Sequence, residues 1–261
     1  MKFRIIKFLV MFTVFSNYSL TCFSKNIEHY KLGDGIKSLE LNKSFSIKLE
    51  GNWKVLKNTA EAWCCGLKLN EIYLAKIDQN NNKLLEFKTL SYLITGFSYQ
   101  VIIDQHFNSE YLSDNSDYGC YEKSDFYYFK LYRFGSTHNC FNIKHIETKK
   151  ELFKNQNLWI KNYFKQNNIK VSPILLTSQS SFYARSVSPR WYVIRSMVDP
   201  VYFGSPALKN ISEDTSEFNY KNINKFSEHK KVIEKWKEKS IKFHKNLEKM
   251  VNAKKNHLLD F

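Results

Sequence analysis

Three arginines, Arg185, Arg190 and Arg195, lie within eleven residues of a chain that otherwise carries its positive charge on lysine. A guanidinium group can donate two parallel hydrogen bonds to a carboxylate or phosphate, which an ammonium group cannot do. If residues 186–189 form a hairpin loop, Arg185 and Arg190 face each other, and like charges in that position repel. Arg195 is five positions from Arg190 and lies on the other face of a regular strand. We therefore expect a counter-charge near these candidate anion-binding residues, either an acidic side chain such as Asp199 or a bound anion.

The cysteines predict disulfide bonds. Apart from Cys22, which lies in the N-terminal segment considered below, the chain contains Cys64, Cys65, Cys120 and Cys140. An even number of cysteines in an exported protein favours disulfides. A bond between the adjacent Cys64 and Cys65 would be strained, so we expect crossed partners or a single Cys120–Cys140 bond. The adjacent pair lacks the two-residue gap of a metal-chelating motif, and we predict no metal site.

No pattern in the sequence identifies a catalytic residue. Asp104 and His106 are two positions apart and could form an acid–base pair on a strand, but no nucleophile elbow accompanies them. His138 and Cys140 would need a free thiolate, which an oxidising location disfavours. Residues 114–125 resemble a calcium loop only in part, because a tyrosine occupies the fifth position and the final glutamate is missing. We expect no catalytic site and no cofactor.

The N-terminal segment predicts export. Lys2, Arg4 and Lys7 precede the apolar run at 8–15, and Ser24 provides a small residue at which cleavage can occur. The apolar run is shorter than the roughly 20 residues of a bilayer-spanning helix. Acylation of Cys22 in a lipoprotein signal is the alternative. We therefore predict a signal peptide at 1–24 and a periplasmic or extracellular location.

The charge indicates an anionic partner other than nucleic acid. The chain has a formal net charge of +15, of which the leader carries three units. Lysine dominates beside many Asn, Ile, Phe and Tyr residues, a composition that an AT-rich coding sequence produces. An exported protein meets anionic lipid, lipopolysaccharide, wall polymer or acidic protein more often than nucleic acid. A solvated lysine surface without a partner is the alternative.

Hydrophobic alternation predicts an antiparallel sheet in a domain at 25–200. We expect a hairpin of Ser44–Leu49 and Trp53–Leu56, with its turn at Glu50-Gly51-Asn52. Further strands are expected at 67–77, 84–94, 99–107, 126–134, 141–146, 169–177, 182–187 and 191–198. A long exposed loop is expected at 108–119.

Helical periodicity appears twice. Thr148 and Glu151 have the spacing of a capping box, which predicts a helix at about 148–167. Residues 201–225 are polar and irregular and are predicted to be a linker. Ser227 then begins a basic amphipathic helix within 226–259, whose apolar residues, including Trp236 and Phe243, recur in steps of three and four. This order of elements predicts an α+β fold.

These features together predict a non-catalytic exported cell-envelope protein that binds a protein partner or an anionic envelope component. The terminal helix either packs on the domain or makes a peripheral membrane contact. An envelope hydrolase with an unidentified nucleophile, or a purely structural accessory protein, are the alternatives.

Overall fold

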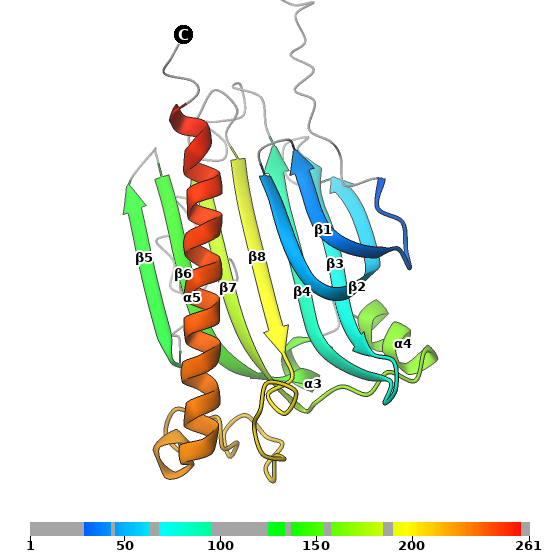
Figure 1. Cartoon of the computed structure of the whole chain (residues 1–261), viewed down its shortest axis with the longest axis vertical. Helices are drawn as coiled ribbons and strands as arrows, with labels where there is room; N and C mark the ends of the chain where they lie inside the picture. Colours follow the sequence, from blue (N-terminus) through cyan, green and yellow to red (C-terminus); the bar gives the residue numbers. More distant parts are fainter. Residues whose placement is uncertain are drawn as a thin grey trace, which may run out of the picture.

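An eight-stranded antiparallel sheet forms the centre of the protein (Figure 1). The structure, a computed structural model, describes residues 29–42, 45–62, 68–94, 125–133, 137–153, 158–184 and 190–256. The strands are β1 (Gly35–Asn42), β2 (Phe45–Ala62), β3 (Lys68–Asp78), β4 (Lys83–Ile94), β5 (Tyr127–Arg133), β6 (Thr137–Glu147), β7 (Ile174–Ala184) and β8 (Arg190–Val198).

The sheet consists of two four-stranded meanders. Its strand order is β1-β2-β3-β4-β8-β7-β6-β5, so the last strand of each meander pairs with the last strand of the other. Nine residue pairs join β4 to β8 without a register shift, from Glu86 opposite Val198 to Ile94 opposite Arg190. This regular central pairing places side chains from both meanders in common rows across the sheet.

Helices cover both faces of the sheet. The long α5 (Ser227–Asn256) runs along one face and contacts β6 and β7 (Figure 1). The short helices α3 (Thr148–Glu151) and α4 (Leu158–Gln166) follow β6 and pack on the other face, and the 3₁₀ turn η5 (Ile223–Lys225) precedes α5. We call these two surfaces of the sheet the α5 face and the α4 face. The α+β fold expected from the sequence is confirmed.

Side chains that alternate along the strands supply a separate core on each face. On the α5 face, Trp236 and Leu247 of α5 are buried against strand residues such as Tyr192. Serines of β7 have small side chains, so α5 can lie close to this strand. The hydroxyl of Ser180 is a hydrogen-bond partner of His244. On the α4 face, Phe164 packs with aliphatic and aromatic residues of six elements, among them Leu56, Ala75, Phe87, Ile146, Leu175 and Met197.

The expected hairpin at 44–56 is wrong. Residues 45–62 form one continuous strand, and its first part pairs with β1, whose weak alternation gave no strand prediction. Ile36 pairs with Trp53 but Ser38 pairs with Lys48, so the Glu50-Gly51-Asn52 segment is a bulge inside β2. Gly51 has a φ of 90°, and a β-carbon there would lie 2.9 Å from the Lys76 side chain. The glycine therefore marks a bulge instead of a turn.

Two helices replace the single helix expected at 148–167. Helix α3 ends at Glu151 and α4 begins at Leu158. The predicted capping box is not formed, because the N-cap is Glu147 and makes no side-chain cap hydrogen bond. The Thr148 hydroxyl instead donates to the carbonyl oxygen of Ser172, and this contact fastens the start of α3 to the segment before β7.

Several other sequence expectations have a structural outcome. The expected strands at 169–177 and 182–187 correspond to the single strand β7. The segment at 201–225 is irregular, as expected, but it is not a solvated linker. Ser216 and Phe218 are fully buried there, and Phe218 packs with Val232 and Trp236 at the start of α5. The expected strand at 99–107 and the loop at 108–119 lie outside the described residues.

Candidate functional site

The structure separates the predicted arginines. Arg195 is half-buried in β8 and its Nε donates to Oε1 of Gln179 over 2.7 Å. Arg190 begins the same strand, and its backbone lies opposite Ala184, so the expected pairing with Arg185 is shifted by one residue. Arg185 itself lies outside the described residues. Asp199 pairs with Lys83 in the structure, and within the described chain no ion pair joins it to an arginine.

Of the four cysteines predicted to form disulfides, the structure describes Cys140. Cys140 is buried in β6 and is disulfide-bonded. Cys64, Cys65 and Cys120 lie outside the described residues, so the Cys120–Cys140 pairing stays a prediction. Asp104, His106 and most of the calcium-like loop at 114–125 also lie outside them.

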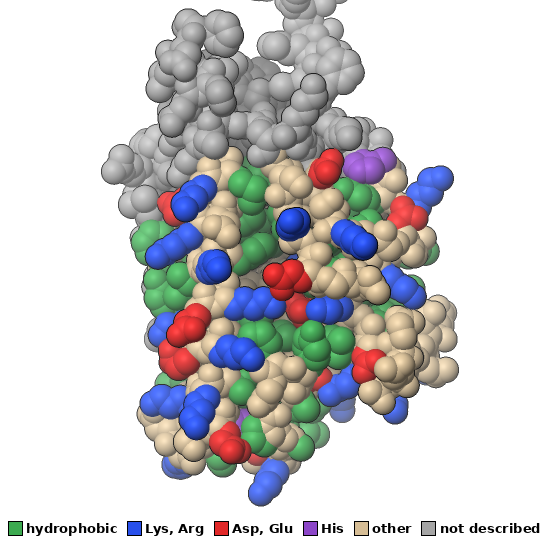
Figure 2. Space-filling view, in the orientation of Figure 1, with side chains coloured by type: hydrophobic (Ala, Val, Ile, Leu, Met, Phe, Trp, Pro, Cys, Tyr) green, Lys and Arg blue, Asp and Glu red, His purple; other side chains and the backbone are tan. Residues whose placement is uncertain are grey.

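Helix α5 presents lysines on the side opposite its buried residues. The buried side follows His229, Ile233, Trp236, Ser240, His244 and Leu247, in steps of three and four. At 3.6 residues per turn, the opposite side carries Lys231, Lys235, Lys242, Lys245 and Lys249, with Glu238 among them. All five lysines are exposed. We call them the lysine ridge, and Figure 2 shows basic side chains gathered along α5.

The five lysines of the ridge are not neutralised by ion pairs within the described part of the chain. Among the described residues, none of its five members is in an ion pair, whereas the neighbouring Lys237 and Lys239 approach Glu234 and Glu86. Lys235 lies over the Phe203 ring, with its Nζ 5.0 Å from the ring centre. The ridge spans about 27 Å at a rise of 1.5 Å per residue. It is therefore an extended positive surface on a rigid helix.

A second lysine group lies beside α5 on the same face. Glu86 is buried and its Oε1 is 3.4 Å from Lys76 Nζ and 4.0 Å from Lys239 Nζ. Two positions along β4, Lys88 Nζ donates to Ser196 Oγ over 2.7 Å and lies between the rings of Trp53 and Phe243. Burial lowers the pKa of Lys88 to about 8; Glu86 opposes this shift and Lys239 adds to it.

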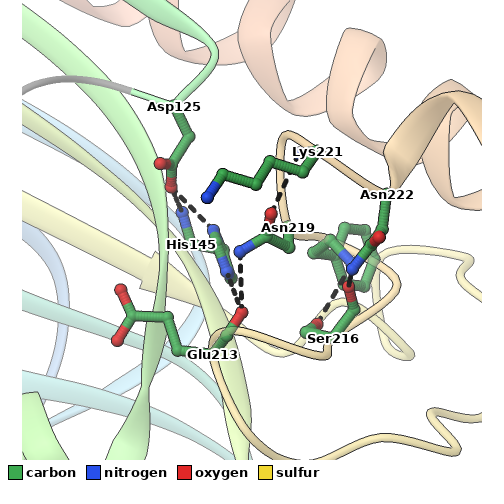
Figure 3. A network of polar contacts seen from close by, with 8 residues as sticks. Asp125, His145, Glu213, Ser216, Asn219, Lys221 and Asn222 are labelled. Carbon is green, nitrogen blue, oxygen red and sulfur yellow. Dashed lines mark hydrogen bonds and ion pairs between the residues drawn. The ribbon is translucent and has the colours of Figure 1, made fainter.

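His145 joins the sheet to the segment that leads into α5 (Figure 3). Its Nδ1 is 2.7 Å from Asp125 Oδ2, and its backbone N–H donates to the same oxygen over 3.0 Å. Its Nε2 is 3.0 Å from the Glu213 carbonyl oxygen, which also accepts a hydrogen bond from the Asn219 side chain. Because a carbonyl oxygen and a carboxylate both accept, the geometry matches an imidazolium with a proton on each nitrogen.

This arrangement gives His145 a structural task. Burial alone would lower the pKa of His145, but the Asp125 carboxylate and the Glu213 carbonyl outweigh it and leave that pKa raised. Both ring nitrogens are engaged and the residue is 1% exposed. It can hold a proton but cannot reach a substrate as a general base. The His145 contacts therefore fasten residues 213–219 to β6.

His244 of α5 has a lowered pKa, whereas that of His145 is raised. Its Nδ1 is 3.0 Å from Ser180 Oγ, and its ring stacks on Phe182 with centroids 4.9 Å apart. Phe141 and Phe129 also lie against the ring, at 4.7 and 6.3 Å. Burial lowers the pKa of His244 to about 4. This serine–histidine pair is buried between α5 and the sheet and resembles a core contact more than a nucleophile with its base.

Sequence reasoning missed His145, His244 and Lys88. The partners of His145 are 20 and 68 positions away, and the spacing of residues carries no signal of such contacts. For His244 a signal existed, because it lies in step with the apolar residues of the terminal helix. Lys88 lies between Glu86 and the buried Leu90 on the side of β4 that faces α5. Its place in this alternation was the signal in the sequence that could have predicted a buried lysine.

The described parts of the chain contain no group of three or more His, Cys, Asp or Glu side chains arranged to hold a metal ion. Among the helices described here, none is both long and apolar enough to cross a membrane. In comparisons with known proteins, no family, no curated protein and no solved structure matches the chain.

Proposed function

We propose that the protein is a non-catalytic, exported cell-envelope protein that binds an anionic envelope component through the lysine ridge of α5. The observation that carries the proposal is the rigid outward placement of Lys231, Lys235, Lys242, Lys245 and Lys249 in the absence of ion pairs among the described residues. Export rests on the leader sequence at 1–24.

The amphipathic character of α5 supports surface attachment over insertion. Its apolar side is occupied by the sheet, since Trp236 is 2% exposed and Leu247 is fully buried. Only the charged side is free to meet a partner. An ammonium group near an anionic membrane surface contributes about 1 kcal/mol to binding. Attachment through the ridge is therefore electrostatic and should weaken as salt is added.

The test is co-sedimentation of the full chain with vesicles of phosphatidylglycerol and with lipopolysaccharide. Lys231→Gln, Lys235→Gln, Lys242→Gln and Lys245→Gln combined should weaken binding by about a hundredfold or more, because four surface lysines are removed. Phosphatidylcholine vesicles should not bind. Absence of binding to both anionic materials would contradict the proposal.

A matched control separates the ridge from net charge. Lys149, Lys161, Lys165 and Lys170 are exposed on the α4 side of the molecule. Their combined replacement by glutamine removes the same number of charges and should leave most of the binding. Equal weakening by the two variants would mean that binding follows net charge, and the ridge would lose its assigned role.

A further inference from the structure

The α4 face of the sheet is apolar near α4 and polar beyond it. One row of residues crosses four strands there, with Tyr73 opposite Thr89, Thr89 opposite Arg195, and Arg195 opposite Gln179. These side chains share a face because all four positions are directly paired and Met197, two residues from Arg195, packs with the α4 cluster. The row therefore brings Arg195 and Gln179 together on the face opposite the lysine ridge.

In the described part of the chain, three hydrogen-bond donors on the strand beside Arg195 have no acceptor. Gln179 accepts from Arg195 Nε, and its own Nε2 is buried with no hydrogen-bond partner. Thr177 Oγ1 and Ser181 Oγ, on the same side of β7, are also buried without a partner. The three residues are 2, 5 and 1% exposed in chain order. A buried polar group without a partner costs about 1–3 kcal/mol, so donors of this kind on one strand face favour the binding of a hydrogen-bond acceptor.

The charges around this row favour an anion. Within the described part of the chain no ion pair joins a carboxylate to Arg195, and its side-chain contact there is the neutral amide of Gln179. The nearest row contains Glu71, whose two oxygens accept from Tyr73 Oη (3.0 Å) and Ser91 Oγ (2.8 Å). Lys57 lies at the margin, 3.6 Å from Glu61. Both oxygens of Glu71 thus accept from neighbouring hydroxyl groups and not from Arg195, and the guanidinium retains donors for a further acceptor.

We propose that Arg195, Gln179 and Ser181 form a binding site for a small oxyanion, a carboxylate or a phosphate group. The two terminal nitrogens of Arg195 would donate to two oxygens of the anion in the fork geometry that a guanidinium provides. The Gln179 amide and the Ser181 hydroxyl supply the remaining donors. The site is independent of the lysine ridge, because the sheet separates the two.

The experiment measures binding to the full chain by titration calorimetry, with inorganic phosphate in one arm and malonate in the other, at constant ionic strength set with chloride. Saturable binding of either anion is expected, and the arm with the higher affinity identifies the group. Arg195→Lys keeps the charge but loses the fork, and should weaken binding by about tenfold or more. Arg195→Gln should abolish it.

Ser181→Ala is a second variant that tests the site even if the arginine variants do not fold. It removes one hydroxyl with almost no change of volume and should weaken binding severalfold while the thermal midpoint stays near that of the wild type. The ridge variant should bind the small anion normally, and Arg195→Gln should still sediment with anionic vesicles. The proposal is overturned if neither anion binds saturably, or if Arg195→Gln and Ser181→Ala bind as the wild type does.

Discussion

His145 shows how a single residue can make folding depend on pH. Its imidazolium form donates to Asp125 and to the Glu213 carbonyl, and the neutral form must give up one of these hydrogen bonds. Its pKa in the folded protein is raised, whereas the unfolded value is about 6.5. The stabilisation is complete below about pH 6.5 and is lost as the pH rises through the raised pKa of the folded state.

We predict that the His145 ring titrates above pH 6.5 in the folded protein and that Asp125→Asn lowers its midpoint. The reason is that an amide cannot stabilise the positive ring as a carboxylate does. The measurement is the chemical shift of the His145 ring protons across the pH range, in the wild type and in Asp125→Asn. A wild-type midpoint at or below 6.5 would show that burial outweighs Asp125, contrary to this prediction.

Sequence reasoning at the residue scale identified residue types better than their partners. Arg195 was singled out for the hydrogen-bonding capacity of its guanidinium group, and the structure places it beside Gln179; its role in binding an anion stays a prediction. The proposed counter-charge Asp199 instead pairs with Lys83, more than a hundred positions earlier in the chain. Contacts of this kind depend on strand order, which a single sequence does not specify.

At the scale of elements, α5 depends on neutral His244. The ring lies among aromatic side chains, and burial lowers its pKa to about 4. Because the folded value lies below the unfolded value of about 6.5, the unfolded state binds the proton more readily between these pH values. The stabilisation is therefore complete above about pH 6.5 and is lost as the pH falls towards 4, opposite in direction to His145.

We predict that acidification from pH 6.5 to 4 reduces the free energy of unfolding through His244 by up to about 3 kcal/mol. His244→Phe should remove this part of the pH dependence, since the pocket of Phe141, Phe129 and Phe182 accepts another aromatic ring. Urea unfolding at several pH values measures the effect. An unchanged acid slope in His244→Phe would assign the dependence to other groups.

The elements themselves were predictable where a regular pattern was long. The periodicity of α5 and the alternation of β3 and β4 gave their positions closely. β1 was missed because Gly35–Asn42 carries few apolar residues, and β2 was divided because Gly51 favours a turn as readily as a bulge. The irregular segment 201–225 was not recognised as part of the core, since Phe218 is isolated among polar residues.

For the whole molecule, α5 is part of the fold and not an appendage. Trp236, Ile233 and Leu247 complete two of the three apolar clusters, and both include sheet residues. Without the helix, large side chains such as Tyr92, Phe182 and Tyr192 on the α5 face would meet water.

We predict that a chain ending at Lys225 does not fold to a stable domain. Loss of near-ultraviolet circular dichroism and of dispersed amide resonances would be the measured result, because both clusters on the α5 face are left incomplete. A chain that ends at Asn252 loses fewer residues, retains the buried residues of α5 and serves as the control. A well-dispersed spectrum from the chain ending at Lys225 would show that the sheet is stable without its helix.

The central pairing of β4 with β8 also dictates an order of assembly. Each meander is built from neighbouring strands, whereas Lys88 and Ser196 across the centre are 108 positions apart. Closing so long a loop is slow compared with forming a hairpin. During synthesis the first meander therefore waits with β4 as an unpaired edge until β8 emerges, and such an edge can pair with another chain. A protein with this topology has a particular need for a chaperone that shields β4 until the C-terminal half arrives.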